Sequence, residues 1–240
     1  MILLLAGTGE ARRIADQLAR AGAPVLASLA GATRDPRRLP VRTRHGGFGG
    51  GDAFLRLLRE EGITKVLDAT HPFAHRISAR SARLCAEVGV PYCQMIRPPW
   101  TAGPGDNWRE IEAEEEAAGI IPERAVVFLA TGRQGLERFV GLAGREVICR
   151  QIEAAPGAFP FVGGRFLIGR PPFPVEDEIA LFRELGVDWL VVKNAGGDAS
   201  ATKLVAARDL GIPVLMLARP PAPDAPHVTT EEDAVAWALA

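Results

Sequence analysis

The stretch "LLLAGTGEARRIA" at residues 3–15 combines an apolar run, a Gly-Thr-Gly turn and a segment with helical periodicity. Glycine lets a chain turn sharply off a strand, and the N–H groups that open the next helix stabilise a bound phosphate. Gly7 and Gly9 therefore predict the first strand–helix corner of a nucleotide-binding unit. Arg12 occupies the position of the third glycine of the dinucleotide-binding pattern. An ordinary tight turn of an α/β protein stays open as the alternative.

Strands and helices alternate along the rest of the chain, which predicts parallel strands joined by crossover helices. Predicted strands lie at 1–6, 24–29, 65–70, 91–96, 125–132, 146–152, 188–197 and 213–219. Predicted helices lie at roughly 10–21, 52–62, 76–88, 136–143, 175–186 and 200–211, and a closing helix follows a Pro-rich bend at 220–226. The predicted fold class is therefore α/β.

The alternation is interrupted between about 97 and 124, where a stretch rich in Pro, Gly and Trp precedes an acidic, helix-forming one. Such irregular stretches are typical of domain boundaries. We therefore expect two domains, residues 1–98 and 99–240. The second half repeats the strand–glycine–helix order of the first, although no internal repeat can be aligned.

Composition excludes several classes of protein. The 240 residues are 48% hydrophobic and 24% charged, which is typical of a folded chain. With 28 basic and 29 acidic residues there is no overall field that would attract nucleic acid or an anionic membrane, and we expect neither as a partner. Three cysteines argue against a disulfide framework or a zinc ribbon. No targeting or membrane-spanning segment is recognisable, so we expect a cytoplasmic protein.

The end of the second predicted strand indicates which nicotinamide nucleotide is bound. NAD-selective folds usually place Asp or Glu there to hold the ribose 2′-hydroxyl. Residues 28–31 read Ser-Leu-Ala-Gly, without an acid, and Ser28, Thr33 and Arg34 could bind a 2′-phosphate through charge-assisted hydrogen bonds, as could Arg37 and Arg38. We therefore expect NADPH rather than NADH. A solvated loop is the alternative for the arginines.

Two further stretches lie where ligands of α/β sheets bind. The loop "HGGFGGGD" at 45–52 surrounds Phe48 with glycines, which favours either close backbone approach to a cofactor or a mobile hairpin tip. "DATHPFAHRIS" at 68–78 follows a parallel strand, so Thr70 and His71 should face the ligand. The spacing of His71 and His75 could suggest a metal pair, but Pro72 interrupts the helix start and no Glu follows His71, so we expect no metal.

With these residues in view, the chain resembles the precorrin-6A reductase family, the NADPH-dependent reductases of corrin-ring (vitamin B12) biosynthesis. The matching stretches are "LLLAGTGEAR", "SLAG", "RHGGFGG", "VLDATHPFAHRIS", "RPPW", "FLATGRQGL", "VVKNAGGDASATKLVAARDLGIPVLMLARP" and the closing acidic–aromatic helix. They run from residue 2 to about 237, and "DATHPFA" together with "KNAGG" is the specific combination. Ala32 departs from the basic residue expected after "SLAG", and Arg34 is the candidate replacement.

The resemblance implies an oxidoreductase that acts on a CH–CH group with NADP as acceptor, reducing one double bond of the precorrin-6A macrocycle to give precorrin-6B. It implies two Rossmann-like domains with parallel sheets flanked by helices, NADPH on the first domain and the macrocycle in a cleft between them. The expected cofactor-binding residues are Gly7, Thr8, Gly9, Glu10, Ser28, Gly31, Thr33, Arg34, Gly47, Phe48, Gly49 and Thr70.

The second half offers groups suited to such a substrate. A precorrin is a large, partly apolar ring fringed with carboxylates, so its site needs an apolar floor with cations and N–H donors. Lys193 ends a buried apolar strand, where a lysine is rarely left unpaired; a structural ion pair is the alternative. The expected substrate-binding residues are His71, Thr131, Gly132, Arg133, Lys193, Asn194, Gly196, Gly197 and Lys203.

Hydride transfer requires no protein nucleophile, because the cofactor carries the chemistry. The partner carbon also gains a proton, for which His71 and water are both candidates. Three other functions stay open: reduction of the cobalt-containing ring of the anaerobic pathway, a non-catalytic nucleotide-binding or sensor module, and a transferase that uses another nucleotide. The sequence leaves the oligomeric state open, and a monomer is consistent with it.

Overall fold

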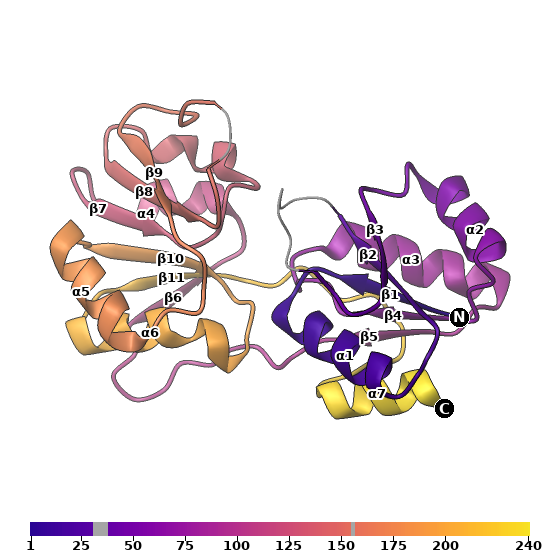
Figure 1. Ribbon diagram of the computed structural model, residues 1–240. Helices are drawn as coiled ribbons and strands as arrows, with labels where there is room; N and C mark the ends of the chain where they lie inside the picture. The colour runs from indigo at the N-terminus through magenta and orange to yellow at the C-terminus, as the bar shows by residue number, and fades with distance from the viewer. Residues whose placement is uncertain (31–37, 155–156) are drawn as a thin grey trace. The chain divides into compact units, whose positions relative to one another are not determined.

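The computed structural model describes residues 1–30, 38–154 and 157–240, and the chain forms two compact units. Unit 1 comprises Met1–Pro98 and Pro220–Ala240, and unit 2 comprises Pro99–Arg219 (Figure 1). No helix within the described ranges is both long and apolar enough to cross a membrane.

Unit 1 is built on a six-stranded parallel sheet in the order β12-β5-β4-β1-β2-β3. Counted along the unit, this is the 3-2-1-4-5-6 order of dinucleotide-binding folds. Its elements are β1 (Ile2–Ala6), α1 (Gly9–Arg20), β2 (Val25–Leu29), β3 (Arg42–His45), α2 (Gly51–Glu60), β4 (Lys65–Asp68), α3 (His75–Val88), β5 (Tyr92–Met95), β12 (His227–Val228) and α7 (Glu231–Leu239).

Helices cover both faces of this sheet, which is why β1 is a continuous apolar run. Side chains alternate across a strand, so Leu4 packs with α1 and α7, whereas Leu3 and Leu5 pack with α2 and α3. Gly22 and Gly89 follow α1 and α3 with positive φ, where glycine carries no steric penalty. The result is a three-layer core with the strand ends left open at its rim.

Unit 2 repeats this plan with the sheet order β6-β11-β10-β7-β8-β9, again fully parallel. Helices α5 and α6 cover one face. Its elements are β6 (Trp108–Ile111), the 3₁₀ helix η1 (Glu114–Glu116), α4 (Ala117–Ile120), β7 (Val126–Leu129), the 3₁₀ helix η2 (Leu136–Leu142), β8 (Glu146–Gln151), β9 (Gly164–Ile168), α5 (Val175–Leu185), β10 (Trp189–Lys193), the 3₁₀ helix η3 (Asp198–Ser200), α6 (Thr202–Leu210) and β11 (Val214–Leu217). The predicted α/β fold with two helix-flanked parallel sheets is confirmed.

The sixth strand of each sheet is exchanged between the two halves of the chain. β6 follows β5 in sequence yet pairs with β11 of unit 2, and β12 follows β11 yet pairs with β5 of unit 1. The expected extension of the second domain to residue 240 is therefore wrong for residues 220–240. Ala234 and Ala238 of α7 are buried beside α1. Figure 1 shows α7 in yellow next to α1 in indigo. A two-residue strand gives too weak a sequence signal to reveal this return.

The structure differs from the prediction at the four edge strands and in two helical segments. β3, β6, β9 and β12 were not predicted, because edge strands such as "RTRH" and "WREI" carry charged residues instead of an apolar pattern. The predicted helix at 136–143 is a 3₁₀ helix that contains Gly141. The acidic stretch before residue 124 forms the end of β6, then η1 and the four-residue α4.

Candidate active site

The corner between β1 and α1 opens at the carboxyl edge of the unit 1 sheet. Gly7 has φ +149°, and no atom lies within 4 Å of the position that a Cβ would take. The Thr8 hydroxyl accepts a hydrogen bond from Ala11 N–H (3.0 Å) and donates one to Ala69 O at the end of β4 (2.8 Å). Thr8 therefore caps α1 and ties the corner to the neighbouring strand. The N–H groups and the positive dipole end that open a helix make such a corner suitable for an anion.

Glu10 in the first turn of α1 forms an ion pair with Arg97 (2.7 Å) and approaches Arg13 (3.8 Å). Burial alone would raise the Glu10 pKa, but its backbone hydrogen bond and the two guanidinium groups outweigh burial and lower it. Arg12 lies in the same turn, and its Nε is buried without a hydrogen-bond partner in the described chain. The absent third glycine has thus not prevented α1 from starting at Gly9.

The ends of β2 and β3 meet beside the glycine-rich loop. Ser28 is 6% exposed, and Arg44 of β3 donates to its hydroxyl (2.8 Å) as well as to the carbonyls of Gly46 and Gly47 (3.1 Å each). The Arg44 guanidinium lies over the Phe48 ring, at 4.4 Å from its centroid. Phe48 packs edge-on against Phe54, so the loop is joined to the core.

A buried hydrogen-bond network fixes the end of β4. Asp68 is fully buried and accepts hydrogen bonds from the backbone and the hydroxyl of Thr70 (2.9 and 2.7 Å) and from the Tyr92 hydroxyl (2.7 Å). Burial, reinforced by Asp68, raises the pKa of Tyr92. The Thr70 hydroxyl also lies 3.3 Å from Ser78 Oγ. Thr70 therefore holds the segment that follows β4 rather than projecting freely from it.

His71 is half-buried directly after this network, at the switch point between β1 and β4 where open α/β sheets bind ligands. Its Nδ1 accepts a hydrogen bond from Phe73 N–H (3.2 Å). A nitrogen that accepts a hydrogen bond carries no proton, so the neutral ring carries its proton on Nε2. This geometry suits His71 to donate a hydrogen bond through Nε2.

Unit 2 gathers its polar groups at the carboxyl ends of β7 and β10. Lys193 Nζ donates to Gln134 O (3.4 Å). Burial lowers the pKa of Lys193, and Arg138 acts in the same direction, whereas Glu114 and the Cys149 thiol oppose this shift. Burial raises the pKa of Cys149 to about 11, so this thiol is not an activated nucleophile.

The loop after β10 is organised around Trp100. The Asn194 side chain accepts from Trp100 N–H (2.8 Å) and donates to Trp100 O (3.0 Å), while the indole N–H donates to Gly197 O (3.2 Å). Lys203 Nζ lies 5.4 Å from the Trp100 ring centroid, and Arg219 donates to Asn194 O (2.5 Å). Asn194 therefore anchors both segments at which the chain enters and leaves unit 2.

The remaining predicted residues fall into three groups. Thr131 is buried, Gly132, Gly196 and Gly197 have positive φ, and the Arg133 guanidinium lies 5.6 Å from the Phe166 ring centroid. Gly47 and Gly49 belong to the loop beside Phe48, and Gly49 has φ +79°. Gly31, Thr33 and Arg34 lie outside the described residues.

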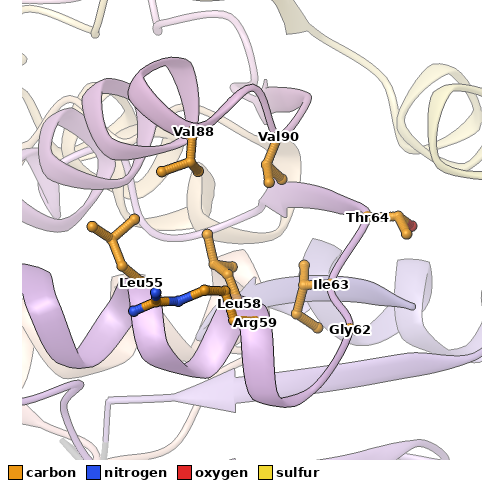
Figure 2. Close-up of a pocket in the computed structure, with 8 residues that line it drawn as sticks. All are labelled: Leu55, Leu58, Arg59, Gly62, Ile63, Thr64, Val88 and Val90. Carbon is orange, nitrogen blue, oxygen red and sulfur yellow. The ribbon is translucent and has the colours of Figure 1, made fainter.

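Sequence reasoning missed Arg44, Arg97 and Trp100 as organisers of these regions. Arg44 lies in the quoted stretch "RHGGFGG", and the other two bracket "RPPW", so the stretches were noticed without a role for these side chains. A separate hollow of about 530 Å³, shown in Figure 2, is lined by residues of α2 and by those that precede β4 and β5. It lies at the amino ends of the strands and is not part of this site.

Strand order, glycine corner and helix cap define the protein as a pair of Rossmann-like α/β units, the first of which has a dinucleotide-binding type of corner. Comparison with known proteins identifies the family. The sequence model of the precorrin-6x reductase CbiJ/CobK family matches residues 1–239, and the chain belongs to this family. The predicted resemblance is confirmed.

Individual relatives cover nearly the whole chain. It is 43% identical to the precorrin-6A reductase of Rhodococcus erythropolis, over 98% of this chain and 96% of the relative. Identity to the precorrin-6A reductase of Rhodobacter capsulatus is 39%, over 98% and 94%. The cobalt-precorrin-6A reductase of Priestia megaterium is 30% identical, over 92% and 91%. The solved structure of the CobK precorrin-6A reductase matches with a TM-score of 0.94 at 39% identity, over 99% and 95% of the two chains.

Proposed function

We propose that this chain is a cytoplasmic enzyme that reduces one double bond of precorrin-6A with NADPH, giving precorrin-6B in corrin biosynthesis. The observation that carries the proposal is identity of 39–43% to relatives named precorrin-6A reductase, at nearly full coverage. Relatives named cobalt-precorrin-6A reductase are 26–30% identical. This difference favours the metal-free macrocycle as substrate.

The residues of the β1–α1 corner fit the diphosphate of NADPH. The space beside Gly7 is open, and its φ of +149° lets the backbone approach a phosphate without a side chain in the way. The first turn of α1, capped by Thr8, would supply N–H donors and the positive end of the helix dipole. When bound, NADPH supplies the hydride.

The protein's own contribution is to orient the substrate and to manage charge and protons. His71 would orient the reacting region through its Nε2–H, and water would supply the proton, because a neutral imidazole N–H is a poor acid. Arg133 and Lys193 at strand ends of unit 2, with Lys203 in the first turn of α6, would bind the acetate and propionate groups. Lys193 is held partly out of water, so a carboxylate would meet a cation that has already lost hydration.

The proposal is tested by mixing the purified protein with precorrin-6A and following NADPH absorbance together with the product spectrum. Consumption of NADPH with formation of a dihydro product supports it, and no turnover with tightly bound NADPH contradicts the assigned substrate. A parallel assay with cobalt-precorrin-6A separates the two substrates, and we expect the metal-free ring to give the higher kcat/KM.

A further inference from the structure

Two guanidinium groups converge on the Phe48 ring in unit 1. Arg44 comes from β3 and its Cζ lies 4.4 Å from the ring centroid, while Arg80 comes from α3 and its Cζ lies 6.0 Å away. The ring itself is fixed by its edge-on contact with Phe54, with centroids 5.0 Å apart. Both cations thus lie within 6.0 Å of the centre of one ring on the rim of the core.

Within the described part of the chain, neither arginine forms an ion pair. Within residues 1–30, 38–154 and 157–240, Arg44 donates only to neutral acceptors, the Ser28 hydroxyl and the carbonyls of Gly46 and Gly47. The Nε of Arg80 is buried and has no hydrogen-bond partner among the residues that the structure describes. Like charges repel, and a buried donor without an acceptor costs free energy. Among the described residues, no anion therefore balances this pair of cations.

The position of this pair in the fold indicates which anion is suitable. Ser28 and Arg44 are direct register partners on the adjacent strands β2 and β3. The end of β2 is where Rossmann folds recognise the ribose 2′ position of a dinucleotide. The described residues that follow Ser28, Leu29 and Ala30, provide no carboxylate that would accept a 2′-hydroxyl.

We propose that Arg44, Arg80 and Ser28 bind the 2′-phosphate of NADPH and thereby select NADPH against NADH, an inference that rests on the proposed function. A phosphate monoester carries close to two negative charges near neutral pH and three strong acceptor oxygens. The planar Arg44 guanidinium can reach two of them at once, and the Ser28 hydroxyl can donate to a third while it still accepts from Arg44. Arg80 adds a second positive charge over the Phe48 ring, which favours a ligand with two negative charges.

The test measures binding of four ligands by quenching of tryptophan fluorescence: NADPH, NADH, adenosine 2′,5′-bisphosphate and AMP. Arg44→Gln should weaken the binding of NADPH and of the bisphosphate by about 10- to 100-fold, because a hydrogen bond between charged partners is lost. It should change the affinity for NADH and for AMP by less than about threefold. Arg80→Gln should act in the same direction with a smaller factor.

Arg42→Gln is the matched control, because Arg42 lies on the same strand and is already paired with Glu61. It should leave all four affinities unchanged. Circular dichroism and thermal unfolding verify that each variant folds, and Arg44→Lys, which keeps the charge but loses the planar fork, should give an intermediate loss.

The outcomes separate the inference from the proposed function. A wild-type protein that binds neither NADPH nor NADH contradicts the proposed function and this site together. Tight NADPH binding with an unchanged NADPH-to-NADH ratio in Arg44→Gln and Arg80→Gln overturns only the 2′-phosphate site. An equal loss of affinity for NADPH and NADH in a folded variant also overturns the 2′-phosphate site, because the arginines would then act on the whole cofactor.

Discussion

Unit 1 and unit 2 share one strand order but differ at the corner where a phosphate would bind. In unit 1, β1 leads through Gly7 and Gly9 into a 12-residue α-helix that Thr8 caps. In unit 2, β7 leads into the seven-residue 3₁₀ helix η2, which has no side-chain cap. A 3₁₀ helix has poorer hydrogen-bond geometry, and it aligns fewer dipoles when it is short. With the same topology, the corner of unit 1 is therefore better suited to a phosphate than the corner of unit 2.

One arginine near the outer strands of each sheet shows a second difference between the units. Arg150 of β8 is bound to Glu178 by two hydrogen bonds of 2.7 Å and lies near the rings of Phe128 and Phe173. Both charged side chains of that pair are nearly fully buried. Arg44 of β3 has only neutral acceptors among the described residues. The comparison shows that a carboxylate neutralises Arg150 inside unit 2, whereas the described residues around Arg44 offer it only neutral acceptors.

Breaking the Arg150–Glu178 pair should cause the largest loss of stability. Glu178→Gln leaves a buried guanidinium without its counter-charge and should lower the free energy of unfolding by about 3–5 kcal/mol. Urea denaturation measures the loss. The double variant Arg150→Met with Glu178→Leu should recover most of it, because no buried charge is then left unpaired.

The exposed pair Arg165–Glu146 provides the control. Glu146→Gln should cost less than about 1 kcal/mol, as is usual for surface ion pairs. A loss of that small size in Glu178→Gln would contradict a structural role for Arg150 and remove the contrast with Arg44.

Valine substitutions at the two corners test whether only one binds the cofactor. Gly7 and Gly132 both have positive φ and open space at the Cβ position, so valine should strain each backbone by about 1–3 kcal/mol. Gly7→Val should also weaken NADPH binding about 100-fold, because its side chain would occupy the space that we propose for the diphosphate. Gly132→Val should leave NADPH affinity unchanged in fluorescence titration, and equal losses in both variants would contradict the assignment.

The central part of the fold is predictable because buried parallel strands carry continuous apolar runs. β1 and β10 are examples, and the glycines that end α1 and α3 indicate where those helices end. β12 and α7 were assigned to the wrong unit, because strand pairing over two residues depends on tertiary contacts. The exchange of the sixth strands likewise depends on which sheet edge is available.

The site was predictable only where a backbone requirement appears in the sequence. Gly7 and Thr8 are such positions, since a turn and a helix cap demand particular residue types. Arg44 and Arg80 were not found, because their convergence on Phe48 requires β3 and α3 to be placed in space. Asn194 was expected to bind substrate, yet its side-chain amide already makes two hydrogen bonds to Trp100, which the sequence could not reveal.

A substitution at Lys193 tests whether unit 2 binds the substrate. Lys193→Met should raise the KM for the macrocycle about tenfold, because one charge-assisted contact is lost, and should leave NADPH affinity unchanged. Burial lowers the pKa of Lys193 from 10.5, so the folded state binds fewer protons than the unfolded state in the window just below that value.

Wild-type stability should therefore gain as the pH rises through this window, and Lys193→Met should lose this dependence while being slightly more stable at neutral pH. Steady-state kinetics and urea denaturation at several pH values measure both effects. An unchanged KM would exclude a substrate contact.

The smallest effect on stability should come from the ion pair of Glu10, the carboxylate at the unit 1 corner. In unit 2, Arg133 and Gln134 follow Gly132, so no carboxylate takes the corresponding place. Burial opposes ionisation of Glu10, but its backbone hydrogen bond, Arg97 and Arg13 lower its pKa below 4.5. Stability from this lowered pKa is present above 4.5 and is lost as the pH falls through the folded value. Arg97→Gln should therefore cost about 1 kcal/mol at pH 7 and less at pH 3, as urea denaturation would show. An equal cost at both values would mean that Arg97 acts through packing, and the corner would then depend on Thr8 rather than on this ion pair.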